Sequence, residues 1–318
     1  MTTIMRSVLA AAAVTGFAAL GTPFVPASAD APVTLRVGAT GNDTAAEVYY
    51  AEELGLFKKR GLVVEVQNLR NGAAEAAAVA GGALDIGEQN VVSMAHAHER
   101  GLPFKFIAPA GEYVGSASTT SLVAGKNAPI KTGKDLEGKT VAVNALGDLT
   151  QIGASAWIDK HGGDSTKVRF TEMPAAEIGA AVGRGTVDAG VIPEPSLTIA
   201  EDAGTVKVVA QPYDAIAERF MINGWFASED WIGKNRAAAK KFADAMYEAG
   251  KWANAHRADS AKILARHSKA DAGVIARMRR ATYGERFDTK TMQTAIDSAV
   301  RYKGLAKPFP AAELIDAL

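Results

Sequence analysis

The chain has 318 residues, with 35 basic and 35 acidic side chains and a formal net charge of zero. This balance argues against nucleic acid and against membrane surfaces as partners. The chain contains no cysteine, which excludes disulfides, thiolate metal ligands and cysteine nucleophiles. The length suits two lobes better than one.

The N-terminus has the three parts of a secretory signal peptide. Arg6 supplies the positive charge, an apolar run covers 8–20, and Ala27-Ser28-Ala29 provides a small-residue cleavage site. A membrane anchor is the alternative, but the run is short for a span of about 20 residues. No cysteine follows the cleavage site to carry a lipid. We therefore expect a soluble mature chain that is retained in the periplasm.

The first part of the mature chain alternates between strand and helix signals. Thr44-Ala45-Ala46-Glu47 fits a capping box, so Thr44 is expected to open a helix. Strands are predicted over 35–37, 63–67, 83–86 and 104–108, and further helices over 73–80 and 90–99. Short links between such elements predict a mostly parallel sheet with helices on both faces.

The same alternation of strand and helix signals starts again near Ser121. Strands are predicted over 122–124, 140–143, 168–171, 187–192 and 206–210, and helices over 149–160, 175–182 and 195–201. Asp148-Leu149-Thr150-Gln151 resembles a second capping box. The glycine-flanked segments 81–87 and 183–190 follow alanine-rich helices in the same way. Two similar α/β units indicate two lobes, and the cleft between lobes is where small ligands bind.

The remainder is predicted to be a strand over 221–226 followed by helices. Phe242, Met246 and Ala249 recur at helical spacing, which is typical of a core face. The prediction is therefore an α/β fold of two lobes joined by two crossover strands near 117–122 and 220–227, which act as a hinge. The expected division is signal peptide 1–29, lobe I 30–118 plus 227–318, and lobe II 119–226.

Five segments in order resemble one family of proteins. They are Ala51–Leu62, Gly82–Gly87, Ile130–Val143, Val187–Gly190 and Glu194-Pro195. Together they are similar to the nitrate, sulfonate and taurine solute-binding proteins of ABC importers, a family that also includes binders of thiamine pyrimidine precursors. The resemblance implies the two-lobed type II periplasmic binding protein fold and an ABC permease in the inner membrane as partner. A monomer is the expected state.

Ligands of open α/β sheets lie beyond the carboxyl ends of the strands. The resemblance places ligand contacts in the same loops. The candidate ligand-binding residues in lobe I are Thr40, Gly41, Asn42, Asp43, Gln89, Asn90 and Glu112. Those in lobe II are Asn144, Gly147, Asp148, Thr150, Gln151, Glu194 and Tyr213.

Two ligand chemistries remain open for this cleft. The helix starts near Thr44 and Leu149 offer free N–H groups to an anion, although a glycine before a helix is also simple turn geometry. The cleft loops contain acidic residues but no lysine or arginine, which disfavours bare nitrate. They favour a ligand with an amine or several N–H donors, such as a taurine-like zwitterion or an amino-pyrimidine. Asp43 and Asp148 have the alternative role of helix caps.

Aromatic side chains offer a cover for a ligand ring. Tyr213 follows a lobe II strand and Trp225 lies near the return crossing, whereas Trp157 lies inside a helix and is expected in the core.

No catalytic, metal or cofactor site is predicted. His96 and His98 are two residues apart on a helix and point in different directions, whereas a helical zinc pair has four-residue spacing. Enzymatic relatives that make a thiamine pyrimidine use clustered cysteines, which this chain lacks. The competing hypothesis is an exported enzyme that uses Glu112 and Glu194 as acid and base.

Overall fold

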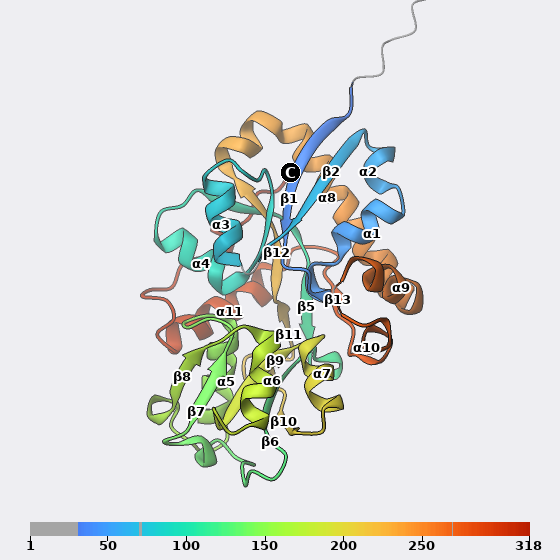
Figure 1. Ribbon diagram of the computed structural model, residues 1–318. Helices are drawn as coiled ribbons and strands as arrows, with labels where there is room; N and C mark the ends of the chain where they lie inside the picture. The colour runs from blue at the N-terminus through green and yellow to red at the C-terminus, as the bar shows by residue number, and fades with distance from the viewer. Residues whose placement is uncertain (1–30, 70–71, 269) are drawn as a thin grey trace, which may run out of the picture. The chain divides into compact units, whose positions relative to one another are not determined.

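The computed structural model describes residues 31–69, 72–268 and 270–318. Every element below belongs to the compact unit Pro32–Leu318 (Figure 1). The expected signal peptide over 1–29 lies outside the described residues.

The first lobe is built on five strands. β1 (Val33–Ala39) pairs in parallel with β2 (Leu62–Asn68). β12 (Asn223–Ser228) lies between β3 (Gly87–Asn90) and β4 (Phe104–Pro109) and is antiparallel to both. A parallel bridge between Val37 and Ile86 joins these two sheets. The order across the lobe is therefore β2-β1-β3-β12-β4, and its fourth position, between β3 and β4, is taken by a strand from late in the chain.

The second lobe is built on a five-stranded sheet of order β10-β6-β9-β7-β8. Its strands are β6 (Thr120–Gly125), β7 (Thr140–Val143), β8 (Arg169–Glu172), β9 (Ala189–Pro193) and β10 (Val206–Ala210). β7 is parallel to β8 and β9, whereas β6 is antiparallel to β9 and β10. Both lobes therefore hold mixed sheets, where the sequence predicted mostly parallel ones.

Three short strands form a small sheet where the chain crosses between the lobes. β5 (Gly111–Val114) pairs with β11 (Arg219–Met221) and with β13 (Thr282–Tyr283), each time antiparallel. β5 follows β4, and β11 leads back into β12. The two crossovers of the predicted fold are thus present, and β13 adds a third strand beside them. The exact lobe boundaries, 118/119 and 226/227, stay a prediction, and the second of them falls inside β12.

Helices cover both faces of each sheet. Those of the first lobe are α1 (Glu47–Glu53), α2 (Leu56–Lys59), α3 (Gly72–Ala80), α4 (Val91–Glu99), α8 (Glu229–Ala255), α9 (Arg257–His267), α10 (Ala272–Arg277) and α11 (Thr289–Arg301). Those of the second lobe are α5 (Leu149–Lys160), α6 (Ala175–Gly183) and α7 (Ser196–Asp202). Successive residues of a strand face opposite ways, so Trp225 packs in one core cluster and Phe226 in the other. The predicted strand at 221–226 is therefore buried on both faces.

Three local predictions need correction. The strand expected at 83–86 is not formed there, because Asp85 turns its carboxylate to Arg36 and the strand begins at Gly87. The capping box at Thr44 is also wrong. A short 3-10 helix, η1 (Asp43–Ala45), precedes α1, and the Thr44 hydroxyl donates to the Asn42 side chain at 2.8 Å. Trp225 is fully buried against Phe242 and is not available to cover a ligand. Trp157 is in the core, as predicted.

Candidate functional site

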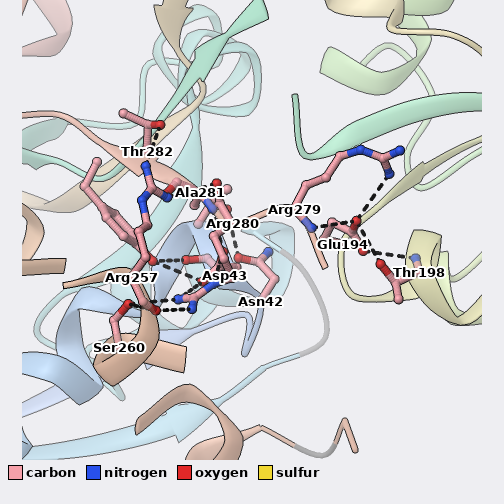
Figure 2. Close-up of polar contacts among 12 residues, drawn as sticks. Asn42, Asp43, Glu194, Thr198, Arg257, Ser260, Arg279, Arg280, Ala281 and Thr282 are labelled. Atoms are coloured by element: carbon pink, nitrogen blue, oxygen red, sulfur yellow. Dashed lines mark hydrogen bonds and ion pairs between the residues drawn. The ribbon is translucent and has the colours of Figure 1, made fainter. Parts of the chain in front are cut away.

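Asp43 lies in a buried ion pair with Arg280, which is remote in sequence (Figure 2). Arg280 donates from Nε and from a terminal nitrogen to the two carboxylate oxygens, each at 2.9 Å. The Ala281 N–H donates at 2.6 Å and the Tyr283 hydroxyl at 3.2 Å. Only 1% of the Asp43 side chain and 11% of the Arg280 side chain are exposed. Asp43, a predicted ligand contact, therefore has its oxygens occupied by the protein itself.

Glu194 is held at the start of α7. Its carboxylate accepts from the Thr198 N–H and hydroxyl, both at 3.0 Å, and from the Arg279 N–H at 3.2 Å. The Arg279 guanidinium lies 3.6 Å away and also pairs with Glu201 at 3.1 Å. Burial raises the pKa of Glu194, and these hydrogen bonds oppose the rise. Figure 2 shows the consecutive arginines 279 and 280 reaching to carboxylates of different lobes.

A polar network closes the carboxyl ends of β1 and β3 together with the first residue of β12. The Thr40 hydroxyl donates to Glu88 at 2.9 Å and accepts from the Asn42 amide at 2.8 Å. Asn223 on β12 donates to the other Glu88 oxygen, and its own side-chain oxygen accepts from the Gly111 N–H. Two predicted residues, Thr40 and Asn42, thus belong to one network with the buried Glu88 at its base.

The two lobes meet directly at the N-termini of α4 and α5. Asn90 caps α4 by accepting from the Ser93 N–H, and Asp148 caps α5 by accepting from the Leu149 N–H. Across the lobes, the Asn90 amide and the Ser93 hydroxyl donate to Asp148 at 2.9 and 3.0 Å. The structure therefore brings together Asn90 and Asp148, which the sequence placed on opposite sides of a cleft. The predicted cap at Asp148 is confirmed.

The Gly147 turn completes this contact. Gly147 has a φ of +72°, which favours glycine, and its N–H donates to Gln151 at 2.8 Å. His96 on α4 lies 3.1 Å from the Gly147 carbonyl oxygen, whereas His98 pairs with Glu313. The two histidines therefore have separate partners, as their spacing predicted.

The other predicted residues lie apart from this contact or inside the protein. Thr150 donates to the Asn144 side chain, and Glu112 pairs with Arg219 on the connecting strands. Gly41 has a φ of +68° and faces the Asn68 side chain. Tyr213 is buried edge-on against Tyr113 and Phe220, and a Cβ on Gly153 would lie 2.5 Å from its ring.

Two polar side chains at this end of the first lobe are buried and incompletely paired. Gln89 donates to the Gly72 carbonyl at 3.2 Å, but its own oxygen has no partner among the described residues. Glu75 accepts from the Glu88 N–H at 2.5 Å, and its other oxygen is likewise unpaired in that part of the chain. Burial, with the nearby Glu88 carboxyl, raises the pKa of Glu75 to about 9. Burial also raises the pKa of Glu88.

The sequence missed the basic residues of this region. Among the described residues, the loops that the sequence analysis placed at the cleft contain none, but Arg279 and Arg280 come from a distant segment between α10 and β13, and Arg219 comes from β11. Asp43 and Arg280 are separated by 237 positions, so no local pattern links them. Glu88 and Asn223 were missed as partners for the same reason. Within residues 31–69, 72–268 and 270–318, no helix is long and apolar enough to cross a membrane.

Solved structures with related folds cover most of this chain. The aliphatic sulphonate binding protein SsuA from Escherichia coli is 22% identical, with a TM-score of 0.73 over 89% of this chain and 97% of that one. The alkanesulfonate-binding protein SsuA from Xanthomonas axonopodis, bound to MOPS, is 18% identical, with a TM-score of 0.74 over 90% and 98% of the two chains. The nitrate-binding protein NrtA from Synechocystis is 16% identical, with a TM-score of 0.73 over 86% and 82%.

Two comparisons of sequence agree with the fold. The putative binding protein YtlA from Bacillus subtilis is 26% identical over 215 residues, which span 67% of this chain but only 64% of that relative. The family model described as "NMT1/THI5 like" matches residues 42–260. The chain therefore belongs to the NMT1/THI5-like family and has the two-lobed fold of periplasmic binding proteins.

Proposed function

We propose that this protein is the periplasmic solute-binding component of an ABC importer. In this proposal a signal peptide over 1–29 directs export, the lobes close on a small organic solute, and the closed form delivers it to the permease. The contact of Asn90 with Asp148 at 2.9 Å carries the proposal. It joins the helix starts of opposite lobes at the strand ends, where a ligand of an open α/β sheet is expected. The family and the fold support the same role.

The charges around this contact favour a ligand with N–H donors. The Asp148 carboxylate already occupies the N-terminus of α5 and accepts from the first turn of α4, so an anion there meets a resident negative charge. Arg279 and Arg280 are paired with carboxylates. The buried Gln89 side-chain oxygen is an acceptor with no partner within 31–69, 72–268 and 270–318. A taurine-like zwitterion or an amino-pyrimidine therefore fits better than a simple anion such as nitrate.

We also propose that the protein does not transform its ligand. The acid–base pair of the competing hypothesis, Glu112 and Glu194, is divided between two separate ion pairs, with Arg219 and with Arg279. Nothing in this arrangement favours proton transfer to a shared substrate. Mass spectrometry of a bound compound after prolonged incubation is expected to return that compound unchanged, and a product would support the enzyme hypothesis.

Isothermal titration with matched pairs of compounds tests both the function and the ligand class. One pair compares taurine with ethanesulfonate, and the other compares an amino-pyrimidine with its hydroxy analogue. Nitrate is titrated as well, as the simple anion. A buried acceptor left without a donor costs about 1–3 kcal/mol, so the amine of the preferred pair is expected to bind about 5- to 150-fold more tightly. Equal affinities within both pairs, or tight nitrate binding, would overturn the ligand class. If the folded protein binds no compound of a broad metabolite library, the result would count against the transport role.

A further inference from the structure

A basic segment contacts both lobes: Arg277 ends α10, and Arg279 and Arg280 follow it before β13. Arg277 pairs with Asp202 at 2.6 Å, and Arg279 pairs with Glu201 at 3.1 Å, both at the end of α7. Arg280 turns the other way, to Asp43 in the first lobe (Figure 2). We propose that the ion pairs of Arg277 and Arg279 hold the second lobe against the first, and we call these pairs the latch. Arg280 is the anchor of the latch, because its pair with Asp43 fixes this segment to the first lobe.

The anchor is rigid because it is buried and held at several points. Arg280 and Asp43 form two hydrogen bonds within the first lobe, and Tyr50 accepts from the same guanidinium at 2.8 Å. Arg257 on α9 donates to the carbonyl oxygens of Arg280 and Ala281. The backbone between α10 and β13 is therefore fixed to the first lobe, and it presents the two latch arginines toward α7.

The receiving side is fixed within the second lobe. The Glu194 carboxylate is held by the N–H and hydroxyl of Thr198, so it keeps its place whether or not Arg279 is near. Three carboxylates, those of Glu194, Glu201 and Asp202, thus face two arginines. These pairs join different lobes and break when the lobes separate, whereas the Arg280–Asp43 pair does not.

The latch is exposed enough to respond to salt. The latch arginine side chains are 58% and 40% exposed, for Arg277 and Arg279 respectively. Such pairs contribute modestly and weaken as the screening length falls from about 10 Å at 0.1 M salt to about 3 Å at 1 M. The latch therefore shifts the balance between closed and open forms without fixing it. This inference rests on the proposed function, since closure matters to a protein that traps a solute.

The test measures closure directly and uses no ligand. The chain has no cysteine, so two introduced cysteines can carry a pair of fluorophores. Lys59→Cys on α2 labels the first lobe and Arg184→Cys after α6 labels the second, both at exposed positions. Single-molecule energy transfer then gives the ratio of open to closed molecules between about 0.05 and 1 M NaCl. The ratio is expected to rise with salt in the parent chain. In Arg277→Gln/Arg279→Gln it is expected to be about 3- to 10-fold higher at low salt and nearly independent of salt.

Two further variants separate the latch from general effects. Arg236→Gln removes an exposed ion pair with Asp316 inside the first lobe and should leave the ratio unchanged. Arg277→Glu alone should lose closed molecules. The double variant Arg277→Glu/Asp202→Arg reverses the charges of this pair and should regain most of that closed population. The thermal midpoint should change little in the latch variants. An unchanged energy-transfer distribution in the folded double variant would overturn the latch, whatever the outcome of the titrations.

Discussion

Replacing Asp43 with asparagine should destabilise the whole first lobe. The substitution keeps the shape of the side chain but leaves the Arg280 guanidinium without its countercharge in a site where only 11% of that side chain is exposed. Burial lowers the pKa of Arg280, but the charge and hydrogen bonds of Asp43, together with Tyr50 and Tyr283, raise it above its ordinary value. Removing one partner of a buried pair costs about 3–5 kcal/mol. We expect Asp43→Asn to lower the free energy of unfolding by that amount.

Urea unfolding followed by tryptophan fluorescence measures this loss without any ligand. Lys240→Gln is the matched control, because it removes a pair with Asp244 in which the side chains are 57% and 47% exposed. Exposed pairs are worth roughly 0.2–1 kcal/mol, so the control should be close to wild type. If Asp43→Asn also loses less than about 1 kcal/mol, the buried pair is not the anchor that its contacts indicate. If Asp43→Asn leaves stability unchanged but weakens ligand binding, Asp43 contacts the ligand, as the sequence analysis predicted.

Three other changes test separate parts of the structure. The pKa of Glu75 rises from 4.5 to about 9, so between these values the folded protein keeps a proton that the unfolded chain releases, and stability falls as pH rises. Glu75→Gln should therefore gain stability over wild type with rising pH, by up to about 1.4 kcal/mol per pH unit in urea unfolding, and a constant difference would contradict the buried neutral acid. Gly153→Ala should lower the free energy of unfolding by about 1–3 kcal/mol, because its Cβ would lie 2.5 Å from the Tyr213 ring; a neutral effect would mean that the ring moves freely. Asp148→Ala should cost about 1–2 kcal/mol through loss of the α5 cap, whereas Asp148→Asn should lose less; equal losses would show that capping is not the main contribution.

Much of the fold was predictable because its signals are local. The runs that form β2, β7 and β10 are rich in valine, and α5 has its cap in the sequence directly before it. The cleft loops were predictable as a set because strands that belong to one sheet end at a common edge. This placed Asn90 and Asp148 in cleft loops of opposite lobes from sequence alone.

Other features depend on contacts that no local pattern contains. Glu47 reads as the last residue of a capping box, but it is buried, and burial raises its pKa well above the ordinary value. The sequence did not decide whether Asp43 and Glu194 contact a ligand or hold the structure together. Their partners, Arg280 and Arg279, lie far along the chain, so no local pattern could reveal the pairs. The antiparallel insertion of β12 turned an expected parallel sheet into a mixed one.

The position of β12 has a consequence for the order in which the protein folds. The slot between β3 and β4 stays empty until Asn223–Ser228 have been synthesised, while every strand of the second sheet has already been made. At about 5–20 residues per second, the ribosome needs on the order of ten seconds to travel from β4 to β12. During that interval the nascent first lobe exposes two unpaired strand edges, those of β3 and β4. The second lobe thus has all of its strands before the first lobe does, and the first lobe waits for β12.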